Sequence, residues 1–275
     1  MSVVTLTEVA TTVNLFSMAA ATSLNLDSAM LARFGVLQGT EAMLPERAVL
    51  GLDWPELERV LPDQGLPRGV VELAAMPRLH GGASRHGSGE WLRGGTTSIA
   101  IAALRSLHAS DEHAWAAWIT AEGTQKRPAV PPIYAPALSQ AGVDLDRLLV
   151  VRPPPQALAR TIVKVAASGA FGLVIVDAPH ASDLSGGVAV PLASRRAGDR
   201  QSGDASAVVV RKLALAAEES GTTTLLLTSG LTQRAIAWPV ALRLEVERRP
   251  DALSIRVTKD RRGCGSSQQV VRLAG

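Results

Sequence analysis

The sequence predicts an α/β fold: a doubly wound, mostly parallel sheet with an antiparallel C-terminal hairpin and an N-terminal helical extension. One observation is an unbroken apolar run that ends in an acid, residues 172–177, because parallel sheets bury such runs on both faces as central strands. A second is the succession of a strand, a glycine-rich loop and a helix over residues 66–107. The third is the change of pattern after residue 240, where apolar and polar residues alternate as in half-buried antiparallel strands.

The first part of the chain divides into an extension and the start of a core. Residues 1–47 are predicted to form a helical extension, with apolar residues at helical spacing around Leu15 and Met18 and again over residues 24–34. Helices of this kind are expected to pack on the core or on a neighbouring subunit. The core is predicted to be one domain that spans residues 48–275.

A short helix is predicted over residues 54–60, ahead of the first core strand. Asp53 is expected to cap the N-terminus of this helix, and Pro55 to occupy its first turn. Gly65 and Pro67 are then expected to turn the chain into the first core strand.

That first core strand, Val70–Ala75, is followed by a long loop and by a helix, Thr96–Leu107, in the layout of a phosphate-binding loop. A working loop of this kind ends in Gly-Lys-Ser/Thr, because the lysine ammonium reaches the outer phosphates and the hydroxyl binds magnesium. The matching residues here are Gly94, Gly95 and Thr96, so the lysine is missing.

No other cation replaces the missing lysine. The first lysine in the chain is Lys126, and Arg93 lies before Gly94, on the wrong side of the turn. Residues 76–93 also make the loop too long to wrap closely around one triphosphate. We therefore expect a nucleotide-binding core that has lost its nucleotide and has no cofactor.

The other core elements are predicted from apolar periodicity and from turn residues. In chain order they are a buried strand over residues 115–121, a helix over 131–141, a strand over 148–151, a helix over 155–166 that ends at Gly169, a strand over 172–177, a mobile loop over 181–206, a helix over 207–220, a strand over 223–228, two alternating strands joined by a turn at 249–252, and a last strand over 270–273. Strands that alternate with helices indicate right-handed crossovers and a parallel sheet.

Composition excludes several classes of protein. No apolar run approaches the ~18 residues of a membrane span, and no basic lead precedes an apolar stretch at the N-terminus. The single cysteine, Cys264, excludes an internal disulfide and a cysteine-rich zinc site, and it fits a reducing cytoplasm. None of the five histidines has a cysteine or a carboxylate at ligand spacing, so no metal is expected.

Charge is unevenly distributed along the chain. Residues 1–60 hold three arginines against seven acids, a net charge of −4, whereas residues 241–275 hold eight cations against four acids, a net charge of +4. Ends of opposite charge favour head-to-tail self-association, or a separate partner for each end. The alternative is that both are ordinary solvated surfaces.

Four stretches of the core resemble the RecA recombinase. They are GLPRGVVEL at residues 65–73, AEG at 121–123, AGVDLDRLLVVRP at 141–153 and GLVIVDA at 172–178, in the RecA order and at similar separations. Within that superfamily, the lead-in to the first stretch, the short C-terminal hairpin and the lost lysine are most similar to ImuA-type proteins of a bacterial mutasome for translesion synthesis. The resemblance covers residues 48–262 and implies a RecA-like core.

The resemblance also implies roles for three residues of the degenerate nucleotide site. Asp177 matches the acid that supports magnesium, Glu122 matches the glutamate that activates the attacking water, and Thr96 matches the magnesium hydroxyl. The alternatives are a strand-end acid that caps a neighbouring loop for Asp177 and a solvated loop acid for Glu122. Without the lysine, the stabilisation that a positioned cation gives to phosphoryl transfer is lost, so no catalytic residue is expected.

The resemblance places a first DNA-contacting loop at residues 181–206, which hold Arg195, Arg196 and Arg200. Arginines in a flexible loop suit contacts with phosphates, and the alternative is a solvated loop without a ligand. The second DNA loop of RecA matches residues 229–238, which are too few for that role. We therefore expect weak DNA binding at most.

Together these expectations describe a cytoplasmic, non-catalytic accessory protein of error-prone translesion DNA repair, active in the bacterial SOS response to DNA damage. The resemblance implies that it acts through contacts with ImuB, RecA or both, and that it forms a small homo-oligomer. Two alternatives remain open at this point: a DNA-dependent ATPase with an unorthodox phosphate loop, and a cell-division inhibitor of the SulA type.

Overall fold

The computed structural model describes residues 49–76, 94–123, 133–184, 195–230, 237–261 and 268–273. Its strands are β1 (Val49–Leu50), β2 (Leu66–Pro67), β3 (Gly69–Met76), β4 (Ala116–Thr120), β5 (Leu148–Val151), β6 (Leu173–Asp177), β7 (Thr223–Ser229), β8 (Leu242–Arg248), β9 (Ala252–Asp260) and β10 (Gln269–Arg272). Its helices are α3 (Pro55–Glu58), α4 (Gly94–Ser110), α5 (Ala135–Gln140), α6 (Leu158–Ala167), α7 (Ala181–Leu184) and α8 (Arg195–Ser220), with 3-10 turns η2 (Leu145–Arg147) and η3 (Pro155–Ala157). The predicted extension over residues 1–47 lies outside the described residues and stays a prediction.

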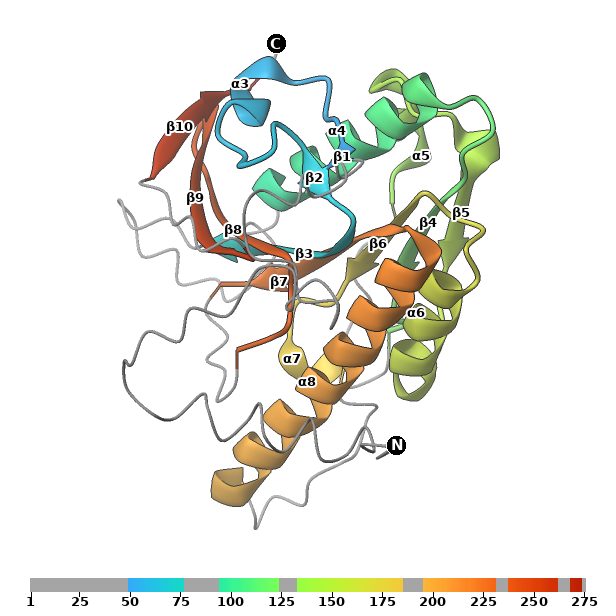
Figure 1. Cartoon of the computed structure of the whole chain (residues 1–275), viewed down its shortest axis with the longest axis vertical. Helices are drawn as coiled ribbons and strands as arrows, with labels where there is room; N and C mark the ends of the chain where they lie inside the picture. Colours follow the sequence, from blue (N-terminus) through green and yellow to red (C-terminus); the bar gives the residue numbers. More distant parts are fainter. Residues whose placement is uncertain are drawn as a thin grey trace, which may run out of the picture. The chain divides into compact units, whose positions relative to one another are not determined.

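Eight strands form one mixed sheet in the order β10-β9-β8-β3-β7-β6-β4-β5 (Figure 1). The pairs from β8 to β5 are parallel, and β9 and β10 add antiparallel strands at the other edge. The predicted α/β class, the mostly parallel sheet and the antiparallel C-terminal hairpin are thus confirmed. None of the described helices is both long enough and apolar enough to cross a membrane.

Both faces of the parallel part of the sheet are buried, as the apolar run before Asp177 predicts. Because strand residues alternate between faces, Leu173 and Ile175 of β6 join the apolar cluster that includes α4, whereas Val174 and Val176 join the cluster that includes α6 and α8. Helices therefore cover the sheet on both sides, with α6 and α8 side by side on one of them (Figure 1).

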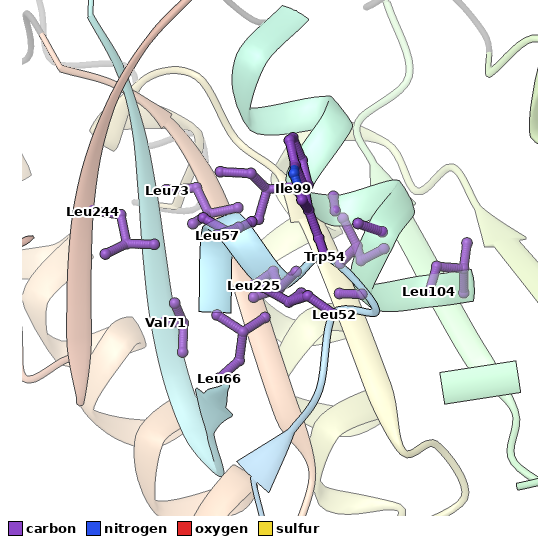
Figure 2. Packing of buried hydrophobic residues seen from close by; sticks show 14 of the residues in the cluster. Leu52, Trp54, Leu57, Leu66, Val71, Leu73, Ile99, Leu104, Leu225 and Leu244 are labelled. Carbon is purple, nitrogen blue, oxygen red and sulfur yellow. The ribbon is translucent and has the colours of Figure 1, made fainter. Parts of the chain in front are cut away.

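The lead-in to the first core strand packs on the face that α4 covers. Figure 2 shows Leu52, Trp54 and Leu57 in one cluster with Ile99 of α4. The indole nitrogen Nε1 of Trp54 donates a hydrogen bond to the carbonyl oxygen of Arg272, at 3.1 Å, and so ties the lead-in to β10.

The predicted capping of the short helix is wrong. Trp54, not Asp53, is the N-cap residue of α3, and Asp53 has a positive φ of 50°. The carboxylate of Glu58 instead folds back and accepts hydrogen bonds from the backbone N–H groups of Leu52, at 2.7 Å, and Asp53, at 3.2 Å. The carboxylate that bonds the backbone here therefore comes from inside the helix and accepts from donors that precede it.

The predicted loop over residues 181–206 is also wrong. The short helix α7 occupies residues 181–184, and α8 begins at Arg195. Glycine, serine and aspartate each cost at most about 1 kcal/mol in a helix, and no proline follows Pro191 in this stretch to end the helix. Leu184 and Ser206 are fully buried where α7 packs on α8, so tertiary contacts offset the weak local preference.

Candidate functional site

The strands that run parallel bring their carboxyl ends to one edge of the sheet, and the candidate nucleotide site lies at that edge. Gly94, Gly95 and Thr96 are the first three residues of α4. Asp177 is the last residue of β6, and alternation with Ile175 directs its side chain to the face that α4 covers. The side chains of Thr96 and Asp177 are 1% and 9% exposed, so both are removed from solvent.

The structure brings Asp177 and Glu122 to neighbouring strand ends. Thr120 of β4 pairs with Asp177 across the β4–β6 ladder, and Glu122 follows Thr120 by two residues. Glu122 is exposed, and its backbone N–H donates a hydrogen bond to the carbonyl oxygen of Pro153 at 2.9 Å. Strand β7 separates β6 from β3, so Asp177 lies two strand spacings, ~10 Å, from the strand that leads into the loop.

Gly95 occupies the position of the missing lysine, and it has no room for a side chain. A Cβ atom built on Gly95 would lie 2.9 Å from Cγ1 of Val246 and 3.2 Å from Cδ2 of Leu253. Val246 belongs to β8 and Leu253 to β9, so both contacts come from the C-terminal hairpin. The hairpin therefore packs directly against the N-terminus of α4.

The carboxyl end of β3 is covered as well. The backbone N–H of Gly230, just beyond β7, donates a hydrogen bond to the carbonyl oxygen of Ala75 at 2.8 Å, and a Cβ atom on Gly230 would collide with the thioether of Met76. The position that a phosphate-loop lysine would occupy is therefore packed against apolar side chains of the hairpin. In the part of the chain that the structure describes, no three His, Cys, Asp or Glu residues cluster as metal ligands.

A buried carboxylate on the opposite face of β3 was missed by the sequence analysis. Glu72 is fully buried, accepts a hydrogen bond from the hydroxyl of Thr228 at 2.7 Å, and lies with Oε2 3.7 Å from Nη1 of Arg243 on β8. The available signals were an acid inside the apolar run of β3 and an arginine at a polar position of the alternating strand β8. Charges that are buried in proteins are paired in this way.

The ion pairs continue from Glu72 across the hairpin. Glu245 of β8 lies 3.8 Å from Arg243 and 2.5 Å from Arg256 of β9. Nζ of Lys259 donates a hydrogen bond to the carbonyl oxygen of Trp238, at 2.5 Å; burial lowers the pKa of Lys259, and the Glu72 charge opposes that shift. These polar contacts fix the hairpin to β3 on one face, while Val246 and Leu253 close against Gly95 on the other.

His108, near the C-terminal end of α4, is buried and contacts Asp144 and Arg147. Its Nδ1 accepts a hydrogen bond from the backbone N–H of Asp144 at 3.3 Å, and its buried Nε2 has no hydrogen-bond partner among the described residues. Arg147 donates to the carbonyl oxygen of His108, at 3.2 Å, and to the carboxylate of Asp144, at 2.7 Å. Burial lowers the pKa of His108, and the Arg147 charge lowers it further.

The three arginines of the expected DNA-binding loop lie in the first turns of α8 instead. The structure describes only the backbone of Arg195, Arg196 and Arg200, so their side-chain contacts lie outside the description. A helical backbone presents arginines at fixed spacing, which differs from the mobile loop predicted for them. Trp238, at the end of the shortened second loop, is 3% exposed and belongs to the core.

No family model matches this chain, and no curated protein matches it.

Proposed function

We propose that this chain is a non-catalytic accessory protein of error-prone translesion DNA repair, built on a RecA-like core. In this proposal it works in the cytoplasm during the bacterial SOS response, through contacts with ImuB, RecA or both. It assembles as a small homo-oligomer and contacts DNA weakly, through α8, where Arg195, Arg196 and Arg200 lie.

The packing of Gly95 is the observation that carries the non-catalytic part of the proposal. A phosphate-loop lysine needs a free path from the start of the helix to the bound phosphates. At Gly95 the Cβ atom alone already meets Val246 and Leu253, at 2.9 Å and 3.2 Å. Without a cation at this position, Asp177 and Glu122 have no phosphoryl group to act on.

The RecA-like part of the proposal is supported by where the four resembling stretches lie. GLPRGVVEL leads into β3, AEG follows β4, AGVDLDRLLVVRP leads into and contains β5, and GLVIVDA contains β6. Each stretch therefore belongs to a parallel strand or to its end. The mixed, doubly wound sheet is of the architecture that the resemblance implies.

Direct binding measurements test the proposal. The full chain is titrated with purified ImuB and, separately, with RecA, by surface plasmon resonance with and without Mg-ATP. We expect submicromolar binding to at least one of the two, independent of nucleotide. Absence of binding to both proteins would contradict the proposal. DNA-stimulated ATP hydrolysis that Asp177→Asn abolishes would favour the alternative of a DNA-dependent ATPase.

A further inference from the structure

The outer surface of α6 and α8 carries four cations that pair with no acid among the described residues. Arg160 and Lys164 lie on α6, and Arg211 and Lys212 lie on α8. All four are exposed, and none forms an ion pair or hydrogen bond with a described residue. Some other exposed arginines do form ion pairs, as Arg256 does with Glu245 and Arg261 does with Glu218.

The two helices align these cations. Both helices lead into adjacent parallel strands, so they run in the same direction, and a Cβ atom on Gly169 would lie 3.9 Å from Cβ of Ser220. Arg160 precedes Gly169 by nine residues, as Arg211 precedes Ser220, so the two arginines lie at the same height on neighbouring helices. Packed helices are ~8–10 Å apart, which places the cations on one continuous surface.

Two aliphatic side chains are exposed in the middle of this surface. Val208 and Leu215 of α8 are 53% and 54% exposed. They are seven residues apart, which is two turns or ~10 Å along the helix axis, and Arg211 and Lys212 lie between them. Together with Arg160 and Lys164, these residues form what we call the basic two-helix surface.

We propose that the basic two-helix surface binds an acidic amphipathic helix of a partner protein. Two apolar anchors two turns apart on the partner would cover Val208 and Leu215, as in helix-in-groove recognition. Acidic residues beside those anchors would pair with Arg160, Lys164, Arg211 and Lys212 and steer the encounter. This inference goes beyond the proposed function, because it names a surface and a partner chemistry whichever protein supplies the helix.

A protein partner is favoured over nucleic acid for two reasons. Neither α6 nor α8 contains an aromatic residue, so the surface lacks the side chains on which unpaired bases stack. Exposed valine and leucine gain nothing from a phosphate backbone, whereas they gain from burial under apolar side chains.

A synthetic probe tests the surface directly. The probe is a fluorescein-labelled helical peptide of about 20 residues, six turns, with two leucines seven positions apart on one face and glutamates beside them. Its affinity for the full chain is measured by fluorescence anisotropy. A matched peptide in which every glutamate is glutamine, and an oligo-dT strand as competitor, complete the set.

Two double variants of the protein locate the binding. Arg160→Glu with Arg211→Glu reverses two charges on the surface, whereas Arg59→Glu with Arg272→Glu reverses two exposed, unpaired charges on the lead-in and on β10. We expect the first pair to weaken peptide binding by about tenfold or more and the second by less than about twofold. Val208→Ser with Leu215→Ser should also weaken it, and oligo-dT should not displace the peptide.

Three outcomes would contradict the proposed binding of an acidic helix. It fails if the acidic peptide binds no better than its glutamine form, or if both double charge reversals have the same effect. Displacement by oligo-dT that is lost in the variant with Arg160→Glu would make the surface a nucleic-acid site instead. If the peptide binds as expected but ImuB and RecA do not, the surface stands and the proposed function fails.

Discussion

The N-terminus of α4 and the outer surface of α6 and α8 differ in how closely other parts of the chain cover them. At the first, Val246 and Leu253 cover Gly95 so closely that a side chain there would have to displace them. At the second, four cations and two aliphatic side chains face solvent without described partners. The sheet edge where a nucleotide would bind is filled with apolar side chains around Gly95. The surface of α6 and α8 instead exposes charged and aliphatic side chains that could bind a partner.

The hairpin is an integral part of the fold and is held in place on both faces of β8. On one face of β8, Val246 closes against Gly95; on the other, Arg243 reaches the buried carboxylate of Glu72. Both contacts hold the same strand, so restoring a side chain at Gly95 would oppose the ion pairs as well as the apolar packing.

The largest expected effect comes from Gly95→Lys. The new side chain must displace Val246 and Leu253, and overpacking of this kind costs about 3 kcal/mol. Urea denaturation should show a lower midpoint with an unchanged slope, and calorimetry should show no ATP binding. Gly95→Ala combined with Val246→Ala should cost less than the sum of the two single substitutions, because each relieves the clash of the other. Strict additivity would show that the two residues are not in contact.

A smaller loss is expected on the other face of the hairpin. Glu72→Gln keeps the shape but removes the charge that faces Arg243, and it should lower the free energy of unfolding by about 1–3 kcal/mol. Glu218→Gln is the control: Glu218 and its partner Arg261 are 40% and 51% exposed, so the loss should stay below about 1 kcal/mol. Equal losses would mean that Glu72 does not anchor the hairpin.

How much of this could be predicted from the sequence depends on the range of the interactions. Apolar runs define their own elements, so β5 was predicted to the residue, and β3 and β6 within one residue at each end. The contact between Gly95 and Val246 joins residues about 150 positions apart, and no local pattern shows it. The sequence shows that the phosphate-loop lysine is missing. Only the structure shows that Val246 and Leu253 pack at its position.

The start of α8 illustrates the opposite limit. Residues 195–206 include six glycine, serine and aspartate residues and have no apolar period, so local reasoning favours a loop. Burial of Ser206 and Leu184 overrides that preference. Glu72 lies in the stretch GLPRGVVEL, which was interpreted for its resemblance and not for its buried charge. The pairing of Glu72 with Arg243 was therefore missed.

A modest pH effect is expected from His108 at the far end of α4. Burial lowers the pKa of His108 below its usual value of 6.5, so the folded state keeps it neutral. The unfolded chain then binds more protons than the folded one, and stability present above pH 6.5 is lost as pH falls below it. The free energy of unfolding should therefore decrease between pH 7.5 and pH 5, and less so in His108→Asn, whose amide oxygen can still accept from Asp144.

The pH dependence of unfolding of the wild type is compared directly with that of His108→Asn. If the free energy of unfolding depends on pH in the same way in the wild type and in His108→Asn, then burial does not keep His108 neutral in the folded state.

The smallest effect on stability is expected from the basic two-helix surface. Arg160→Glu turns a like-charge pair with Lys164, four residues on, into an attractive one, and such pairs contribute only about 0.2–0.5 kcal/mol. Together with Arg211→Glu, the change in unfolding free energy should stay within about 0.5 kcal/mol. A larger loss would mean that these arginines serve the fold, and thermal unfolding followed by circular dichroism distinguishes the two cases.

Isothermal titration of the full chain with Mg-ATP tests the central claim most directly. The packing of Gly95 against the hairpin predicts no heat of binding at micromolar or millimolar nucleotide, and the same null result for Asp177→Asn. Saturable binding with a micromolar Kd in the wild type, abolished by Asp177→Asn, would contradict the account, because it would place a working nucleotide site where the structure has apolar packing.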